Sequence, residues 1–311
     1  MTVNVLFAAP EKDWEEYAPH LRTALADFGI AADVGTDIAP EATDYIVYAP
    51  NSPLQDFRPF TRCKAVLNLW AGVEQVVSNP TLSQPLARMV DEGLTNGMVE
   101  WVCGHTLRHH LGMDTHIHGQ DGIWREGSVP PLASERTVCI LGIGALGSAC
   151  AHRLAQFGFK MRGWSRGPKQ VEGVTCFHGE NGLKEALTGA DIVILLLPNT
   201  PDTENTLNSE TLALLAHCAV VINPGRGPLI DDDALLAALD SGQIGQATLD
   251  VFRSEPLPAD HPYWSHPRVT VTPHIASATR PNTAARVVAE NIRRGEAGEP
   301  FLHLVNRQSG Y

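Results

Sequence analysis

Three polar residues stand out because each follows a run of apolar residues in the second half of the chain. Arg226 lies in Asn-Pro-Gly-Arg-Gly just after the run 219–222, Glu255 follows a second run, and His274 lies in Thr-Pro-His-Ile-Ala after 269–271. In an open parallel α/β sheet, such positions share the carboxyl edge, where ligands bind. We therefore expect these three side chains to meet in one site.

An arginine, a histidine and a carboxylate are the groups that reduction of a 2-keto acid requires. The planar guanidinium of Arg226 can hold a carboxylate with two hydrogen bonds and polarise a ketone. His274 can protonate the oxygen as hydride reaches the carbon, and Glu255 would orient the ring and favour its protonated form. Alone, each residue could equally be structural or a solvated charge, but their joint placement favours catalysis.

A glycine motif earlier in the chain predicts a dinucleotide site. The segment 140–149 reads ILGIGALGSA, which fits G-x-G-x-x-G between an apolar strand and an Ala-rich helix. The first glycine permits a tight turn, the second allows close approach of a pyrophosphate, and the third lets the helix pack on the strand. The binding residues expected here are Gly142, Gly144, Ala145, Leu146 and Gly147.

The tip of the next expected strand indicates which dinucleotide is bound. A carboxylate there would accept the ribose hydroxyls of NAD, but the segment 163–169 reads GWSRGPK and contains none. Arg166 and Lys169 can pair with a 2′-phosphate, and Ser165 can donate a hydrogen bond to it. We therefore expect NADPH to be preferred, with NADH possible, although Arg166 could also be a solvated loop charge.

The elements that carry these residues predict two α/β domains, each a doubly wound parallel sheet. Short strands and one helix fill the first hundred residues, and from 137 to 271 continuous Val/Ile/Leu strands alternate with helices, as burial on both faces requires. A helix at 279–294 comes after the last strand and could return to the first domain. We expect a Rossmann-type dinucleotide-binding domain, 98–277, inserted into a flavodoxin-like substrate domain, 1–97 plus 278–311.

Length and composition exclude several classes of protein. The 311 residues suffice for about two domains, and 35 acidic against 23 basic residues give a net charge of −12, which disfavours nucleic-acid binding. No apolar run approaches the roughly 20 residues of a membrane span, and no signal peptide is recognisable, so we expect no membrane partner and a cytoplasmic location. The six cysteines form no C-x-x-C pair, which is typical of reduced thiols.

Taken together, the motifs resemble the D-isomer-specific 2-hydroxyacid dehydrogenase family over essentially the whole chain. The resemblance rests on the glycine motif, LLLPNTPDT at 195–203, NPGRG at 223–227, LDVFRSEPLP at 249–258 and TPHIA at 272–276. The WSR turn at 164–166 and GMVEW at 97–101 are similar to the glyoxylate/hydroxypyruvate reductase A group of that family. This implies glyoxylate or hydroxypyruvate as substrate and a homodimer formed through the connection 119–134.

The resemblance also implies roles for individual residues. It makes Arg226 the substrate clamp, His274 the proton donor and Glu255 its partner. Asp250 would engage the nicotinamide carboxamide. Two further sets follow: Pro198, Asn223 and Gly225 would lie along the cofactor, and Trp70, Ala71, Gly72 and Val73 would form the substrate loop, whose amides hold the substrate carboxylate.

The sequence departs from the family pattern at two positions. The family more often has Ala where Gly225 stands, which we expect to be a tolerable change. Trp70 makes the substrate loop bulkier than usual, so a larger keto acid such as phenylpyruvate, or 3-phosphoglycerate, stays open as an alternative substrate. A non-catalytic nucleotide-sensing protein is the alternative from another class.

A histidine-rich segment could suggest a metal site. His105 and His109 are four residues apart on one face of an expected helix, 98–118, but no Asp or Cys completes a ligand set. We expect a histidine-rich helix and no metal.

Overall fold

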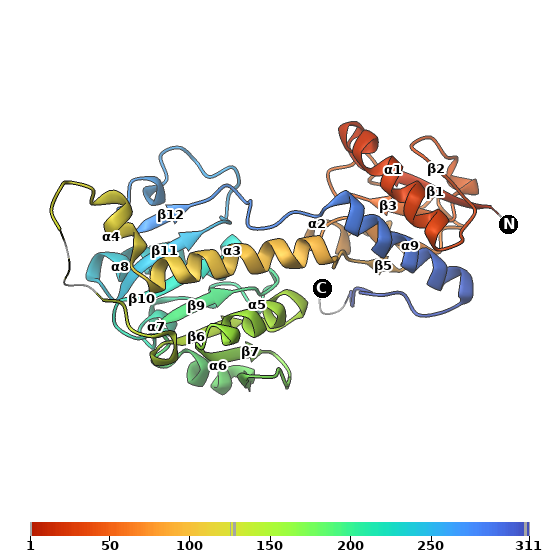
Figure 1. Ribbon diagram of the computed structural model, residues 1–311. Coiled ribbons are helices and arrows are strands. Elements are labelled where there is room, and N and C mark those ends of the chain that lie inside the picture. The colour runs from red at the N-terminus through yellow and green to blue at the C-terminus, as the bar shows by residue number, and fades with distance from the viewer. Residues whose placement is uncertain (1, 125, 127–128, 308–309, 311) are drawn as a thin grey trace. The chain divides into compact units, whose positions relative to one another are not determined.

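The computed structural model describes residues 2–124, 126, 129–307 and 310 and divides the chain into two compact units (Figure 1). The first comprises residues 1–94 and 278–311, and the second comprises residues 95–277. The sequence placed these boundaries at 97/98 and 277/278. The first boundary lies inside helix α3 (Glu92–His110), where no change of composition marks it.

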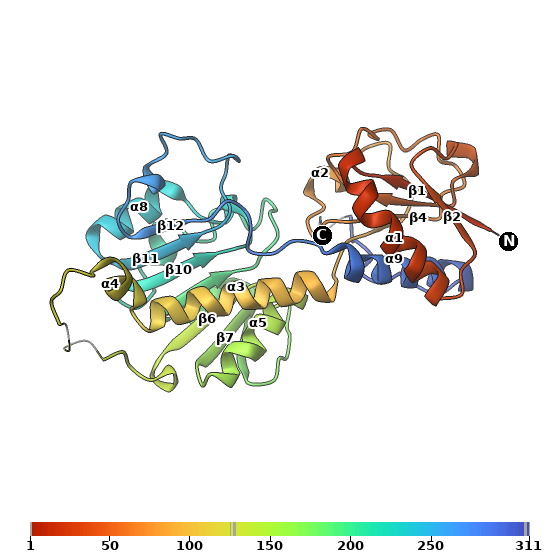
Figure 2. The ribbon, with the colours of Figure 1, turned by 45° about the horizontal axis from the view of Figure 1, so that its top comes forward.

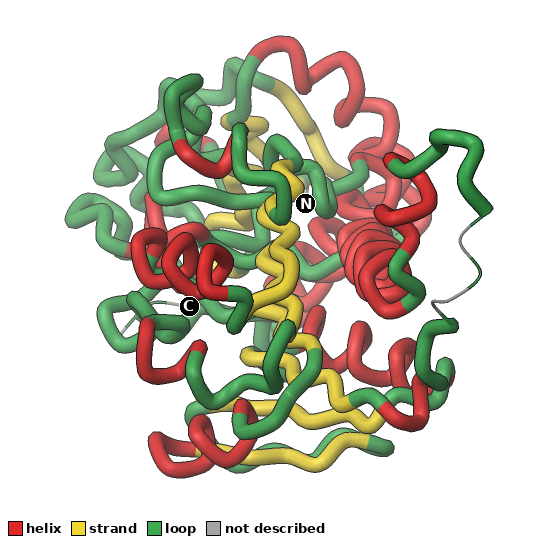
Figure 3. The backbone as a smooth tube through the Cα atoms, turned by 90° about the vertical axis from the view of Figure 1, so that its left-hand side faces the viewer, coloured by secondary structure: helices red, strands yellow, loops and turns green. Residues whose placement is uncertain are grey.

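The first unit is built on a five-stranded sheet in which all strands run parallel. Its strand order, β2-β1-β3-β4-β5, is that of flavodoxin-like folds, as predicted. Figure 3 colours the strands of this sheet, like all others, yellow. They are β1 (Val3–Ala8), β2 (Ala32–Gly35), β3 (Tyr45–Tyr48), β4 (Ala65–Asn68) and β5 (Leu86–Ala87).

Helices cover one face of this sheet, and loops and a short helix cover the other. Helices α1 (Glu11–Asp27) and α9 (Pro281–Ala297) lie side by side and share an apolar core with alternate strand residues (Figure 2). Helix α9 thus returns to the first unit, as the sequence suggested. The opposite core contains Phe57, Phe60 and Val76 of α2 (Glu74–Val77). Helix α1 begins at Glu11, and Asp13 lies in its first turn.

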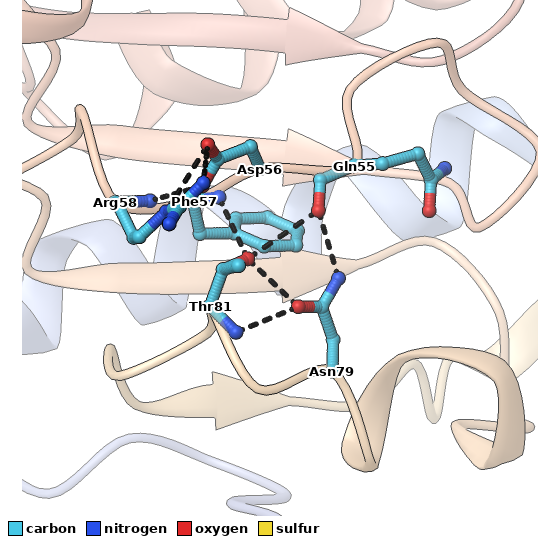
Figure 4. Close-up of polar contacts among 6 residues, drawn as sticks. All are labelled: Gln55, Asp56, Phe57, Arg58, Asn79 and Thr81. Carbon is cyan, nitrogen blue, oxygen red and sulfur yellow. Dashed lines mark hydrogen bonds and ion pairs between the residues drawn. The ribbon is translucent and has the colours of Figure 1, made fainter.

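A hydrogen-bond network holds the loops on this second face (Figure 4). The Thr81 hydroxyl accepts the Phe57 N–H at 3.0 Å, and the Asn79 amide donates to the Gln55 carbonyl at 2.9 Å. Arg58 pairs with Asp56 on the exposed side of the same loop. The network therefore fixes the buried Phe57 ring against β3 and β4.

The second unit has a seven-stranded parallel sheet of order β12-β11-β10-β9-β6-β7-β8. Read from β8, this is the Rossmann order 3-2-1-4-5-6 with one further strand, and the direction of winding switches between β6 and β9. The strands are β6 (Thr137–Leu141), β7 (Lys160–Ser165), β8 (Val174–His178), β9 (Ile192–Leu195), β10 (Ala219–Asn223), β11 (Ile244–Leu249) and β12 (Val269–Val271).

Helices cover both faces of this sheet, which explains its continuous apolar strands. Helix α3 and α5 (Ala145–Gln156) pack on one face, as Figure 1 shows, and α6 (Gly179–Leu187), α7 (Ser209–Leu212) and α8 (Asp232–Ser241) pack on the other. Alternate strand residues face each side, for example Ile140 toward α5 and Leu141 toward α8's core. A short helix, α4 (Met113–His118), and 3₁₀ turns at 40–42, 133–135, 227–229 and 262–264 complete the described elements.

Three details of secondary structure differ from the prediction. The expected helix 98–118 is two helices, because Gly112 takes a left-handed conformation (φ 62°) between α3 and α4. Strand β5 was missed because it has two residues, and the partly exposed edge strand β8 because it lacks an apolar run. Among the described residues, no helix is long and apolar enough to cross a bilayer.

Candidate active site

The glycine turn after β6 has the geometry that a dinucleotide requires. A Cβ on Gly142 (φ 103°) would lie 2.5 Å from the Leu196 carbonyl oxygen, and one on Gly147 would lie 2.0 Å from the Gly142 oxygen. A Cβ on Gly144 would meet nothing within 4 Å. The backbone around Gly142 and Gly147 therefore leaves no room for a side chain, whatever binds there. Gly144, with Ala145 and Leu146 opening α5, leaves space at a helix N-terminus, where a phosphate binds well.

The tip of β7 carries the three residues expected to select the cofactor. Arg166 is exposed, whereas Ser165 is buried and donates from its hydroxyl to the Gly167 carbonyl at 2.8 Å. The Lys169 ammonium donates to the Ile143 carbonyl at 3.1 Å, which places it beside the glycine turn. No carboxylate follows β7 before residue 172, so the basic character predicted for this tip is present.

His274 and Glu255 form the hydrogen-bonded pair that acid catalysis needs. The His274 Nδ1 lies 2.7 Å from a Glu255 oxygen, and the other oxygen of Glu255 accepts the Phe252 N–H at 2.9 Å. The imidazole is about half exposed. Because the carboxylate occupies Nδ1, Nε2 is the nitrogen left to exchange a proton with a ligand.

Asp250, at the end of β11, holds the loop that carries His274. Its buried carboxylate accepts the Thr272 hydroxyl at 2.5 Å and the Ile275 and Ala276 N–H groups, both at 2.9 Å. Its carbonyl accepts the His274 N–H at 2.9 Å. These bonds fix His274 in a left-handed conformation (φ 54°), which a non-glycine residue rarely adopts. The contact with a nicotinamide stays a prediction.

The turn that carries Arg226 is also held from its backbone. The Asn223 side chain donates to the Arg226 carbonyl at 2.9 Å and accepts the Gly225 N–H at 3.1 Å. Asn223 is therefore a positioning residue within the described contacts. A Cβ on Gly225 would lie 2.7 Å from the Leu195 carbonyl oxygen, so this backbone accommodates the glycine that stands where the family more often has alanine.

Sequence reasoning missed Arg253, which ties three segments around the site. Its guanidinium donates to the Ile230 carbonyl at 2.6 Å and also contacts Asn205 and, at 3.2 Å, Glu204. It therefore links the loop before Glu255 to the chain on both sides of the Arg226 turn. Nothing in the sequence distinguishes it from a solvated arginine, because its partners lie more than twenty residues away.

Pro198 lies three residues past the end of β9, at the sheet's carboxyl edge. Its carbonyl accepts the Thr203 hydroxyl at 2.7 Å, and that hydroxyl also accepts the Thr200 N–H. The loop after β9 is thus closed on itself at this point. A role for Pro198 beside an adenosine stays a prediction.

The substrate loop predicted at 70–73 belongs to the first unit and follows β4. The Asn68 amide donates to the carbonyls of Trp70 (2.7 Å) and Gly72 (3.0 Å), which turns both carbonyls inward. Within the described residues, the N–H groups of Ala71, Gly72 and Val73 donate to no acceptor. Three free amides in a row suit a carboxylate. Sequence reasoning missed Asn68, although a polar residue ending a buried strand is a usable signal.

The histidine pair considered for a metal has another explanation. His109 is buried, with Nδ1 2.5 Å from the Gln246 side chain and Nε2 2.7 Å from the Thr248 hydroxyl. Both ring nitrogens therefore have protein partners. Burial lowers the pKa of His105 to about 4 and also lowers that of His109.

Comparison with known proteins agrees with this geometry. Residues 103–276 match the model of the NAD-binding domain of D-isomer-specific 2-hydroxyacid dehydrogenases, and that span contains the glycine turn and the Arg226, Glu255 and His274 loops. The chain belongs to this family. It is 38% identical, over 99% of its length and all of the relative's, to a protein named glyoxylate/hydroxypyruvate reductase A from Yersinia enterocolitica.

Two solved structures of the family are similar over the whole chain. One, from Xanthobacter autotrophicus Py2 in complex with NADPH and MES, is 39% identical with a TM-score of 0.93 and full coverage of both chains. The other, an NADPH-dependent glyoxylate/hydroxypyruvate reductase from Sinorhizobium meliloti with NADP and sulfate, is 34% identical with a TM-score of 0.84, again with full coverage.

In a 2-hydroxyacid dehydrogenase, a dinucleotide is the resident cofactor, and the residues described here fit one. The open face of Gly144 and the N-terminus of α5 suit a pyrophosphate, and the base-rich, acid-free tip of β7 suits a phosphorylated ribose. Arg226, Glu255 and His274 lie in this same unit, whereas residues 70–73 lie in the other. We expect these residues to serve as proton donor, anion clamp and cofactor cradle.

Proposed function

We propose that this chain is an NADPH-dependent reductase of small 2-keto acids, converting glyoxylate to glycolate and hydroxypyruvate to D-glycerate. The observation that carries the proposal is the 2.7 Å hydrogen bond between His274 and Glu255, on loops of a dinucleotide-binding unit. Relatives named glyoxylate/hydroxypyruvate reductase A, and similar structures with NADPH or NADP bound, support both the substrate class and the cofactor.

Each of the site residues has a defined role in this reaction. When bound, the reduced nicotinamide supplies the hydride that forms the new C–H bond at the carbonyl carbon. His274 then gives the Nε2 proton to the carbonyl oxygen, while Glu255 holds Nδ1 and stabilises the imidazolium before transfer. Arg226 holds the carboxylate and orients the ketone. The products are a 2-hydroxy acid and oxidised cofactor.

The test is loss of NADPH absorbance with glyoxylate, hydroxypyruvate, pyruvate and phenylpyruvate, repeated with NADH. We expect fast turnover of the two small acids and a lower KM for NADPH than for NADH. His274→Ala should lower kcat by about 100-fold or more, whereas His152→Ala, an exposed histidine on α5, should not change it. Activity on phenylpyruvate alone would assign a bulkier keto acid as the substrate. Full activity of His274→Ala would refute the proton-donor role.

The cofactor assignment has its own test. Arg166→Ala should raise the KM for NADPH by about 10-fold or more and leave that for NADH nearly unchanged, because only the former carries the 2′-phosphate. Lys160→Ala removes an exposed charge at the opposite end of β7 and serves as the control. Equal effects of Arg166→Ala on both cofactors would contradict the assignment.

We also propose that two copies of the chain form a homodimer through the connection 119–134. Family resemblance suggests this, and Trp124 and Val129 are 86% and 89% exposed there, alongside exposed Ile123 and Leu132. Apolar side chains gathered on one surface segment usually mark an interface. Analytical ultracentrifugation should give a dimer for the native protein and a monomer for Trp124→Glu. A native monomer would refute the proposal.

A further inference from the structure

Arg88 is a cation in an unusual setting in the first unit. It directly follows β5, and its side chain is half-buried. Within the described residues, no carboxylate or carbonyl oxygen accepts a hydrogen bond from its guanidinium, and burial lowers its pKa. A guanidinium withdrawn from water without an acceptor is unfavourable. An anion that comes from outside the chain would remove this cost.

The backbone determines the face of the sheet on which Arg88 lies. The Arg88 N–H donates to the His303 carbonyl at 3.0 Å, and the Met89 N–H donates to the Trp70 carbonyl at 3.0 Å, so the chain stays extended beyond β5. In extended chain, side chains alternate between faces. Ala87 and Met89 both belong to the core beneath α1 and α9, so Arg88 lies on the other face.

That other face is the one on which the substrate loop ends. Leu86, two residues before Arg88, shares its core with Val73 and Val76. Val73 is the last residue of the loop whose amides donate to no described acceptor, and Trp70 at the start of this loop is bonded to the residue after Arg88. Arg88 and the loop therefore occupy neighbouring strands at the carboxyl edge of one sheet, where α/β folds bind ligands.

We propose that Arg88 is a substrate-binding residue that holds an oxyanion of the keto acid together with the amides of Ala71 to Val73. This inference rests on the proposed function and refines it. The first unit then carries a positive charge of its own for the carboxylate. Arg88 thereby favours keto acids over neutral aldehydes and ketones of the same size, because only the acids carry the oxyanion.

Arg88→Met tests the proposal by kinetics and by binding. An ionic hydrogen bond of ordinary strength corresponds to about 10- to 100-fold in affinity. We expect the KM for glyoxylate and the Kd for oxalate, measured by calorimetry with the NADPH-saturated protein, to rise by that factor. The KM for NADPH should not change, and the melting temperature should not fall. Arg88→Lys, which keeps the charge, should recover part of the loss.

Arg58→Met is the matched control, since Arg58 is an exposed arginine of the same unit that is paired with Asp56. It should leave all four quantities unchanged. A folded Arg88→Met protein whose oxalate Kd and glyoxylate KM stay within twofold of the native values would overturn the proposal. If the native protein reduces no keto acid but loses oxalate binding on this substitution, the reductase function fails and the anion site stands.

A measurement on the native protein decides the matter if Arg88→Met does not fold. The pKa of His303 is lowered first by burial and then by the charge of Arg88. An oxyanion that neutralises Arg88 should therefore raise the pKa of His303, which NMR of its ring proton follows in a pH titration with and without oxalate. An unchanged titration under saturating oxalate would place the anion elsewhere and refute the role of Arg88.

Discussion

Asp250→Asn is the substitution that best separates two roles for one carboxylate. The family resemblance gives Asp250 a contact with the nicotinamide, whereas the structure shows its carboxylate bonded to the Thr272 hydroxyl and to the Ile275 and Ala276 N–H groups. An asparagine has one carbonyl oxygen and one NH2 group in the same space. Its NH2 must therefore face at least one N–H donor, so at least one bond is lost.

The magnitude follows from the type and number of bonds. Hydrogen bonds to a charged, buried acceptor contribute about 1.5–3 kcal/mol each, and neutral ones about 1 kcal/mol. Loss of one bond, weakening of the others and the opposed donors should lower the free energy of unfolding by about 3–5 kcal/mol. Removal of a buried charge offsets about 1 kcal/mol or more of this. We expect a net loss of roughly 2–4 kcal/mol.

The assay is urea unfolding combined with steady-state kinetics. Because Asp250 fixes the loop 272–276, kcat should fall by about 10-fold or more through misplacement of His274. Thr272→Val removes one of the three bonds and should show the same pattern at about half the size. Asp240→Asn changes an exposed carboxylate of the same unit and should have no effect. An Asp250→Asn protein of native stability and kcat, with only the KM for NADPH raised, would refute the positioning role.

Three further outcomes are expected. Gly144→Ala should melt like the native protein but raise the KM for NADPH by about 10-fold, whereas Gly147→Ala, whose Cβ would meet a carbonyl at 2.0 Å, should lower the melting temperature. Glu255→Gln should lower kcat by about 10-fold with a change in unfolding free energy below about 1 kcal/mol, because its pair with His274 is partly exposed. The unfolded chain protonates His105 near pH 6.5 and the folded chain only near pH 4, so the free energy of unfolding should fall by about 1 kcal/mol as the pH is lowered from 6.5 to 4. The fall should be smaller in His105→Gln.

Much of the fold was predictable because strands buried on both faces of a parallel sheet appear in the sequence as continuous apolar runs. Strands β10 and β12 have the bounds expected from their apolar runs, and α9 was placed beyond the last strand, from where it returns to the first unit. The features that the prediction missed have no such apolar run. Strand β8 is half exposed, and the break between α3 and α4 depends on the conformation of one residue, Gly112.

In the site, too, features set by neighbouring residues were predictable, whereas features set by residues distant in the chain were not. Glycine spacing identifies the turn at 142–147 because the whole motif lies within six consecutive residues, of which Gly142 and Gly147 each lie against a carbonyl. The close approach at Gly225 could not be predicted, because the Leu195 carbonyl belongs to a neighbouring strand thirty residues earlier in the chain. The partners of Asp250 and Arg253 lie at comparable separations. Such contacts follow from the register of strands, which composition and spacing do not encode.

The structure also explains why the reactive side chains can stay partly exposed and still be well placed. His274 is half exposed, and its ring is hydrogen-bonded to Glu255. Its position is fixed through its backbone, by Asp250, as that of Arg226 is by Asn223. The positions of His274 and Arg226 are therefore set by buried residues that need not touch the substrate. Substitutions of these residues should lower kcat together with stability, whereas Arg88→Met should change substrate affinity alone.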